Sequence, residues 1–175
     1  LDILESVKEG DGAPLSTEWV ARARQVLARA GQRVAGDLRS KTLSRLRGLY
    51  VIVDPESTRG RPVLDVAEAA LKGGASVVQL RDKVNERGEV LGVARELKST
   101  CEEHDALFIV NDDPGLALFS EAHGVHLGRT DIPAAEARRV LKPSQILGLS
   151  NNSMDEVAGS QAQGADYLAV GAVFG

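Results

Sequence analysis

Short apolar runs alternate with amphipathic stretches along most of the chain. The runs are nearly continuous in Val, Ile, Leu and Ala, which is typical of strands that are covered on both faces. They predict six strands, over residues 49–54, 76–82, 107–112, 124–128, 146–150 and 167–174. Between the strands, apolar positions recur at helical spacing and predict helices over residues 61–74, 87–101, 114–120, 132–141 and 153–164.

Signals at the helix ends support two of these assignments. Pro62 lies near the start of the first helix and Gly73 lies just past its end, which is the usual placement of these residues. Ser153 and Glu156 have the spacing of a capping box, and Gly164 is a stop signal.

The alternation of strands and helices predicts a parallel sheet with right-handed connections. An open doubly wound sheet and a closed (β/α)8 TIM barrel both fit this pattern. No Gly-x-Gly-x-x-Gly motif follows the first strand, which counts against a dinucleotide-binding sheet. Polar residues follow four of the strands, and only a barrel brings every strand end to one site. We therefore expect an α/β fold, a (β/α)8 barrel truncated after about six strands, with an extra N-terminal helix.

The segment before the first strand has a different composition. Between Thr17 and Arg47 it has eight Lys or Arg residues and two Asp or Glu residues, and its apolar residues recur at helical spacing. It is interpreted as a basic arm for nucleic acid or as a helical linker from an upstream domain. The linker is favoured, because a charge excess on one helix is usually a solvated face. The expected domains are therefore 1–47, a basic amphipathic helix or linker, and 48–175, a barrel that is incomplete at its C-terminal end.

Composition narrows the functional classes. The net charge of −4 argues against a general binder of nucleic acid or of membrane surfaces. No apolar run approaches the roughly 18 residues of a membrane span. Cys101 is the one cysteine, so the chain has no internal disulfide, which fits a cytoplasmic location.

The second predicted strand ends in three polar residues at alternate positions. Gln79, Arg81 and Lys83 share one face if the strand extends that far. Arg and Lys are suited to phosphate oxygens, and a Gln amide is suited to a heteroaromatic base. The alternative is a solvated strand end, with Arg81 and Lys83 paired to Glu86 or Asp82.

Carboxylates follow the third and fourth strands. Asp112 comes directly after Asn111, and Asp131 follows the segment Gly124–Gly128. Such carboxylates can hold Mg²⁺ together with substrate phosphates. The alternative for the third strand is turn chemistry, because Asn, Asp, Pro and Gly are all turn residues.

Two further polar residues lie on the fourth and fifth strands. His126 is expected to be a hydrogen-bonded core residue rather than a catalyst. Ser150 could bind a substrate phosphate or cap the turn that follows it. No Gly-x-Ser-x-Gly elbow surrounds Ser150, which argues against a hydrolase nucleophile. Together, the cations, carboxylates and small polar groups predict a site for a Mg²⁺-bound diphosphate.

Five segments carry a resemblance to a known family. QLRDK (79–83), NDD (111–113), GVHLGRTD (124–131), LGLS (147–150) and GADYLAVGAVF (164–174) occur in the order and spacing of thiamine-phosphate synthases. The resemblance covers Leu49 to Gly175 and leaves out the basic helix before it.

The resemblance implies a (β/α)8 barrel and a transferase of thiamine biosynthesis. The family joins 4-amino-5-hydroxymethyl-2-methylpyrimidine diphosphate to a thiazole phosphate, releasing pyrophosphate by a Mg²⁺-assisted dissociative mechanism. Asp112 and Asp131 correspond to its Mg²⁺ ligands, and Arg81, Lys83 and Ser150 to its catalytic residues. The residues implied to bind the pyrimidine diphosphate are Gln79, Arg81, Lys83, Asn111 and Ser150.

The chain departs from the family pattern at several positions. His123 stands where the family usually has Asp, Arg129 where it has Gln, and Asn151-Asn152 where it often has Thr-His or Ala-His. The Thr-rich loop and the lysine that should follow GAVF are absent, so we expect this chain alone to lack half of the thiazole site and to be inactive. The first residue is Leu1, and we expect the chain to be a fragment.

Two other functions stay open at this point. A thiazole tautomerase is a sister barrel that needs no diphosphate site, and a non-catalytic barrel could bind thiamine intermediates as a sensor. The expected partners are the two small-molecule substrates, an upstream fused domain and a second copy of the chain in a homo-oligomer. Neither nucleic acid nor membrane is expected.

Overall fold

The computed structural model describes residues 16–172 and divides the chain into two units, residues 1–37 and 38–175. The described part of the first unit lies in one helix, α2 (Thr17–Leu43), which continues into the second unit. The Trp19 N–H donates a hydrogen bond to Ser16 Oγ at 3.2 Å at the start of this helix. The predicted N-terminal helix is confirmed, and it passes through Gly31 and Gly36 without a break.

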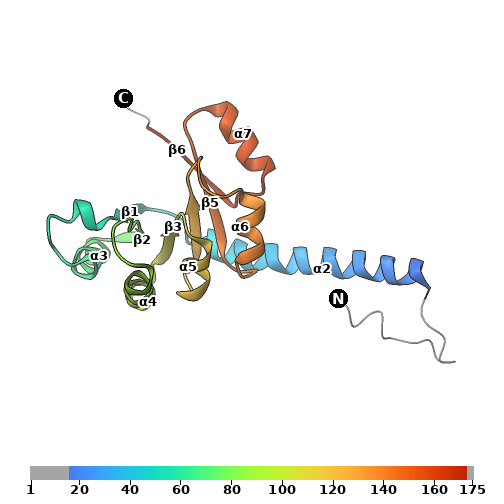
Figure 1. Cartoon of the computed structure of the whole chain (residues 1–175), viewed down its shortest axis with the longest axis horizontal. Coiled ribbons are helices and arrows are strands. Elements are labelled where there is room, and N and C mark those ends of the chain that lie inside the picture. The colour runs from blue at the N-terminus through green and yellow to red at the C-terminus, as the bar shows by residue number, and fades with distance from the viewer. Residues whose placement is uncertain (1–15, 173–175) are drawn as a thin grey trace. The chain divides into compact units, whose positions relative to one another are not determined.

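The second unit contains one sheet of six parallel strands, and their order across the sheet follows their order along the chain. The sheet curls into half of a barrel, as Figure 1 shows. The predicted strands are confirmed, although the last one ends at Val170 and residues 173 and 174 of its expected range lie outside the described residues. The strands are β1 (Leu49–Val53), β2 (Ala75–Leu80), β3 (Leu107–Asn111), β4 (Gly124–Leu127), β5 (Ile146–Asn151) and β6 (Tyr167–Val170).

A helix follows each of the first five strands, after a short 3-10 turn η1 (Pro55–Ser57) in the first connection. Two of these connecting helices begin with side-chain caps: Asp113 accepts a hydrogen bond from the Leu116 N–H, and Ser153 accepts one from the Glu156 N–H. These caps satisfy backbone groups that a helix start leaves unpaired. The helices are α3 (Val63–Lys72), α4 (Arg87–Glu103), α5 (Pro114–Phe119), α6 (Ala134–Val140) and α7 (Met154–Ala162).

The strands separate two apolar clusters because successive side chains point to opposite faces of the sheet. The larger cluster packs the outer face of the sheet against the helices, with Leu80 and Phe108 on the strands and Leu97 on α4. Cys101 is buried in this cluster, as expected for a small apolar side chain. The smaller cluster lies on the inner face, where Leu43 and Leu46 and two tyrosines pack against it. Its members are Val77, Leu107, Ile109 and Ile146. The inner-face positions farther along the same strands are polar, and the candidate site begins there.

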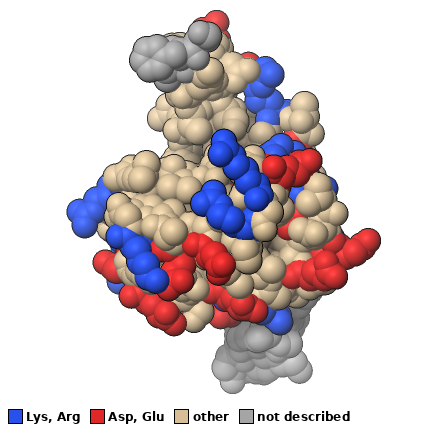
Figure 2. Space-filling model, turned by 90° about the vertical axis from the view of Figure 1, so that its left-hand side faces the viewer, with Lys and Arg blue, Asp and Glu red and all other residues tan. Residues whose placement is uncertain are grey.

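One face of the molecule mixes both signs of charge. On the face drawn in Figure 2, Lys and Arg side chains lie beside Asp and Glu side chains and do not merge into one basic surface. Among the described residues, no helix combines the length and the apolar character that crossing a membrane would require.

Asp166 connects three elements at the amino-terminal side of the sheet. Its carboxylate accepts hydrogen bonds from Arg39 Nε at 2.9 Å, from Arg138 Nη2 and from the Leu147 N–H at 2.8 Å. Charge-assisted hydrogen bonds of this kind are about twice as strong as neutral ones. They hold the end of α2, helix α6 and strand β5 in one arrangement.

Gly124 allows strands β4 and β5 to approach closely. A Cβ atom at this position would overlap the carbonyl oxygen of Ile146 on the neighbouring strand. Because the obstructing atom belongs to the backbone, the clash can be relieved only by moving a strand.

Gly124→Ala should therefore destabilise the fold by about 2 kcal/mol, the usual cost of overpacking. Gly92→Ala is the matched control, because Gly92 is exposed on α4 and a Cβ there meets no atom within 4 Å. The control should stabilise the protein by up to about 1 kcal/mol through helix propensity. Urea unfolding of the full-length protein measures both, and equal stabilities for the two variants would refute the close-approach argument.

His123 joins three strands just before β4. Its N–H donates to the Phe108 carbonyl at 2.9 Å, its carbonyl accepts from the Ile146 N–H at 2.9 Å, and its Nδ1 accepts from the Phe108 N–H at 2.9 Å. Burial lowers the pKa of the imidazole to about 4. The ring is therefore neutral at pH 7 in the folded protein.

This depressed pKa predicts a loss of stability on acidification. Between about pH 6.5, where an unfolded histidine titrates, and about pH 4, the unfolded chain binds a proton that the folded chain does not. Stability should fall through this window by up to about 3 kcal/mol. His123→Asn, whose side-chain oxygen can replace Nδ1 as acceptor, should flatten the decline in urea unfolding measured across the window. His104→Asn at an exposed helix end is the control, and an unchanged slope in His123→Asn would count against the assignment.

Candidate functional site

Arg81 lies at the carboxyl end of β2, beside the end of β1. Its N–H donates to the Val53 carbonyl at 2.9 Å, and its guanidinium forms an ion pair with the Asp54 carboxylate. Asp54 also accepts a hydrogen bond from the Glu56 N–H at 3.0 Å, so the carboxylate is fixed from two sides. The arginine is thereby held at the edge of the sheet where the strands end.

Lys83 reaches the end of β3. Its Nζ lies 3.0 Å from Asp112 Oδ2, and its side chain is half exposed. The alternative that paired Arg81 and Lys83 with Glu86 or Asp82 is wrong, because the structure pairs them with Asp54 and Asp112. Asp82 instead accepts hydrogen bonds from backbone groups of the turn that follows it.

The neighbouring carboxylates Asp112 and Asp113 have separate roles. Asp113 caps α5, accepting from the Leu116 N–H at 2.9 Å, so the turn interpretation holds for this residue. Asp112 has a left-handed backbone with φ of 64°, and its N–H donates to the His126 carbonyl at 2.8 Å. This conformation is uncommon outside glycine, although Asp tolerates it better than most residues. It turns the Asp112 carboxylate away from the helix cap and toward Lys83.

Asp131 brings a second carboxylate to Asp112. Its Oδ2 accepts a hydrogen bond from the Gly128 N–H at 2.7 Å, within the loop that follows β4. Burial raises the pKa of Asp131, and the nearby Asp112 carboxyl group raises it further. The charge of Lys83 acts in the opposite direction. Thus Lys83, Asp112 and Asp131, which come from three different strand ends, form one cluster.

This cluster suits a hard divalent cation that keeps some of its water. Among residues 16–172, no three His, Cys, Asp or Glu side chains converge in the manner of an all-protein metal site. Two carboxylates are nevertheless enough for a cation such as Mg²⁺, which takes its remaining ligands from water and phosphate oxygens.

A chain of hydrogen bonds crosses the inner face of the sheet. Tyr50 Oη lies 3.2 Å from Tyr167 Oη, which lies 3.1 Å from His126 Nδ1, and His126 Nε2 lies 2.8 Å from Ser150 Oγ. Burial lowers the pKa of His126 and raises the pKa of Tyr50 to about 12. All these groups are therefore uncharged at pH 7. His126 is the hydrogen-bonded buried residue that the sequence predicted.

The sequence pattern did not identify Tyr50 and Tyr167 as neighbours of the site. The alternation of side chains along a strand could have done so for Tyr50. It lies on the same face of β1 as Ile52, which pairs in register with Gln79. Tyr167 likewise pairs with Gly148, where a Cβ would overlap its ring.

Gln79 is a buried polar side chain on the inner face whose amide donor is unpaired among the described residues. Only 2% of Gln79 is exposed, and its Nε2 has no hydrogen-bond partner among the described residues. Buried donors are nearly always paired, so one without a partner requires an explanation such as a ligand acceptor. Asn111 lies on the same face at the end of β3, in register with His126.

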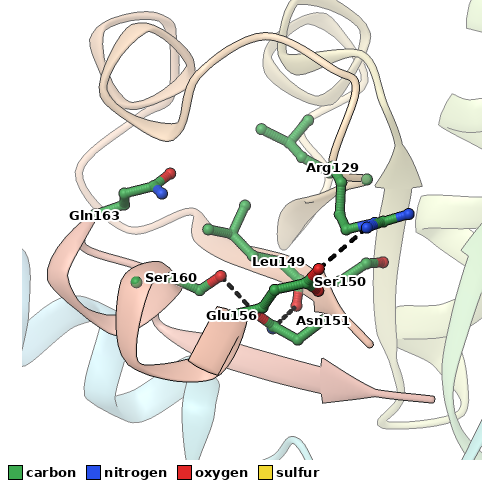
Figure 3. Close-up of a pocket in the computed structure, with 10 residues that line it drawn as sticks. Arg129, Leu149, Ser150, Asn151, Glu156, Ser160 and Gln163 are labelled. Atoms are coloured by element: carbon green, nitrogen blue, oxygen red, sulfur yellow. Dashed lines mark hydrogen bonds and ion pairs between the residues drawn. The ribbon is translucent and has the colours of Figure 1, made fainter. Parts of the chain in front are cut away.

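A separate cavity of about 380 Å³ lies beside the ends of β4 and β5, against α7 (Figure 3). Ser150 and Gly128 reach its wall from the strand side, and Glu156 and Gly159 from the helix side. Besides Gln79 and Asn111 on the inner face, the other five predicted residues fall into three local groups. Arg81 is with Asp54, Lys83 is with the two metal-type carboxylates, and Ser150 is with His126.

The chain is similar in sequence to known proteins of one family. The family model described as thiamine monophosphate synthase matches residues 49–175. A thiamine-phosphate synthase from Thioalkalivibrio sulfidiphilus is 46% identical over 136 residues, which is 77% of this chain and 64% of that protein. The thiamine biosynthesis bifunctional protein ThiED of Geobacter sulfurreducens is 41% identical over 136 residues, which is 78% of this chain and 27% of that protein.

The fold of the chain is also similar to that of a solved structure from this group of proteins. The solved structure of thiamine phosphate pyrophosphorylase from Pyrococcus furiosus superposes with a TM-score of 0.68 at 37% identity, over 74% of this chain and 62% of that chain. The chain spans less than two thirds of the length of the curated relatives it matches first. Since the family model covers all six strands and the helices between them, the chain belongs to the thiamine monophosphate synthase family.

Proposed function

We propose that this chain carries the pyrimidine diphosphate site of a thiamine-phosphate synthase. The reaction joins 4-amino-5-hydroxymethyl-2-methylpyrimidine diphosphate to a thiazole phosphate and releases pyrophosphate. The observation that supports it most directly is the cluster of Lys83, Asp112 and Asp131 at three strand ends, next to the Arg81–Asp54 pair. A diphosphate needs cations and a metal in this combination, whereas a thiazole tautomerase does not need a diphosphate site.

Asp112 and Asp131 would hold Mg²⁺ in this proposal. When bound, the ion would supply positive charge to the diphosphate that leaves. Lys83 Nζ lies 3.0 Å from Asp112 Oδ2, which supports a role for its ammonium group in binding oxygens of the diphosphate that the metal would hold. The guanidinium of Arg81, held by Asp54, adds a second fixed cation.

The pyrimidine end of the substrate would lie over the inner face. The unpaired amide of Gln79 offers a donor to a ring nitrogen, and Asn111 offers a further amide beside it. His126 Nε2 lies 2.8 Å from Ser150 Oγ, and this hydrogen bond supports a fixed hydroxyl that would contact the substrate. Gln79, Asn111 and Ser150 thus bind, and Arg81, Lys83 and Ser150 act on the departing diphosphate.

This set of residues fits a dissociative substitution. The C–O bond to the diphosphate breaks first, and the thiazole nitrogen then donates its electron pair to the carbon of the pyrimidine cation. Such a reaction needs charge stabilisation of the leaving group and no covalent nucleophile. The inner-face groups are consistent with a reaction that uses no covalent nucleophile, because burial keeps His126 and the two tyrosines in their neutral forms.

We further propose that the protein acts in the cytoplasm and forms a homo-oligomer. Residues 48–175 form the barrel, and residues 1–47 would link it to an upstream domain. The bifunctional relative supports a fused arrangement, because this chain matches 27% of its length. The basic helix α2 would then be a spacer rather than part of the site.

The metal site can be tested with two neighbouring aspartates. Asp112→Asn in the natural full-length protein should lower the Mg²⁺-dependent formation of thiamine phosphate by about 100-fold, because it removes a metal-type carboxylate. Asp113→Asn should leave the rate close to that of the unchanged protein, because asparagine also caps a helix. Product is measured by mass spectrometry with and without Mg²⁺. Product formation that is independent of both Mg²⁺ and Asp112 would contradict the proposal, and no product at all would favour the tautomerase or the sensor.

The pyrimidine contact can be tested with two buried glutamines. Gln79→Met should raise the KM for the pyrimidine diphosphate by about 10-fold and leave stability unchanged or increased, because an unpaired buried amide costs free energy in the free protein. Gln145→Met is the control, since the Gln145 amide donates to the Ala117 and Ala122 carbonyls at 2.7 and 2.8 Å. It should lower stability by about 2 kcal/mol without changing KM. The reverse pattern would show that Gln79 serves the fold rather than the substrate.

A further inference from the structure

The loop that carries Asp131 faces a cavity. Gly128 and Arg129, at the start of this loop, line one side of the cavity of about 380 Å³, while Glu156 and Gly159 of α7 line the other. Asp131 itself is held from within the loop by the Gly128 N–H at 2.7 Å. The loop that carries Asp131 is therefore bordered by this cavity on the side of α7.

An ion pair crosses it. Arg129 Nη1 lies 3.0 Å from Glu156 Oε1, and Figure 3 shows the arginine extending from the β4 end toward the helix. Half of the Arg129 side chain is exposed, at 55%, so the pair is partly solvated. Such a pair makes a modest contribution, but it fixes a geometry that a loop alone does not fix.

Glu156 is itself anchored in the connection that follows β5. Its Oε2 accepts a hydrogen bond from the Asn152 N–H at 2.6 Å, and its N–H donates to Ser153 Oγ at 3.3 Å. The Asn152 N–H, followed by the Arg129 side chain, lowers the pKa of Glu156, which keeps the carboxylate charged. One carboxylate thus binds two loops, one that carries Asp131 and one that directly follows Ser150.

The two metal-type carboxylates repel each other when no cation lies between them. The Asp112 and Asp131 side chains contact each other at the ends of neighbouring strands, so their like charges oppose this approach. A loop that is free to move would relax the repulsion by carrying Asp131 away from Asp112. A contact that opposes this movement keeps the Asp112 and Asp131 carboxylates close enough to bind one cation together.

We propose that Arg129 is a positioning residue, whose ion pair with Glu156 holds the β4–α6 loop against α7 and keeps the Asp131 carboxylate beside Asp112. Arg129 does not touch the cation or the substrate in this role. The inference rests on the proposed function, because it takes Asp112 and Asp131 as the metal ligands. It also gives a physical role to one of the positions where the sequence departs from its family.

Mn²⁺ alone is the probe that tests this role. Electron paramagnetic resonance of free Mn²⁺ measures its Kd for the full-length protein without any substrate. Arg129→Met should raise that Kd by about threefold, the effect expected of a partly exposed ion pair. Arg139→Met is the matched control, because it also removes one positive charge and breaks a 3.0 Å pair, with Glu136, that lies within α6. The control should leave the Kd unchanged.

A second pair of variants separates positioning from general loss of charge. Glu156→Gln should raise the Kd for Mn²⁺ by the same factor, a direction that the loss of a negative charge would also give. The double variant with Arg129→Met therefore decides: positioning predicts a Kd no weaker than that of either single variant, whereas charge effects alone would cancel and return the Kd to that of the unchanged protein. Arg129→Lys should restore part of the affinity. A Kd for Arg129→Met equal to that of Arg139→Met would overturn the inference alone. A Kd that Asp112→Asn leaves unchanged would overturn the proposed metal site, and the inference with it.

Discussion

The whole site depends on the parallel register of the strands. All six strands run in the same direction, and side chains along each strand alternate between the two faces. Every second residue of one strand therefore lies on the same face as every second residue of the neighbouring strand, beside it. Gln79 pairs with Ile109, and Asn111 pairs with His126, so polar groups distant in sequence become neighbours above one apolar layer. The inner apolar cluster supports them from below, and helices cover the other face. No single loop could place these groups as firmly.

The charged side chains at the strand ends form ion pairs with one another. Arg81 and Lys83 each contact a carboxylate, Asp54 and Asp112, so neither cation is left without a counter-charge. The same carboxylate that binds Lys83 also lies near Asp131, where it helps to raise the pKa of that carboxyl group. A dication with an attached diphosphate would satisfy both kinds of group at once: its metal would relieve the repulsion between carboxylates, and its oxygens would take the cations.

Much of the fold could be predicted from the sequence, because strands and helix caps depend on residues that are close together along the chain. Strands covered on both faces are continuous apolar runs, and the caps at Asp113 and Ser153 require only nearby residues. The partners of the site residues could not be predicted, because they depend on backbone conformation and register. The φ of 64° at Asp112 sends one aspartate to Lys83 while its neighbour caps a helix, and the pairing of Arg81 with Asp54 joins residues 27 positions apart. The hydrogen bonds from His126 to Ser150 and Tyr167 likewise join three strands.

Buried polar side chains serve two purposes here, and hydrogen-bond satisfaction separates them. Gln145 is buried and donates to two carbonyls while accepting from the Lys142 N–H at 2.8 Å, so its bonds are complete without any ligand. Gln79 is equally buried, at 2% exposed, yet its Nε2 has no partner among the described residues. Folding alone favours replacing such a group by an apolar one of similar shape. A buried amide that costs free energy in the free protein is explained if a ligand acceptor completes its hydrogen bonds. This contrast supports the proposed substrate contact at Gln79 and a structural role for Gln145.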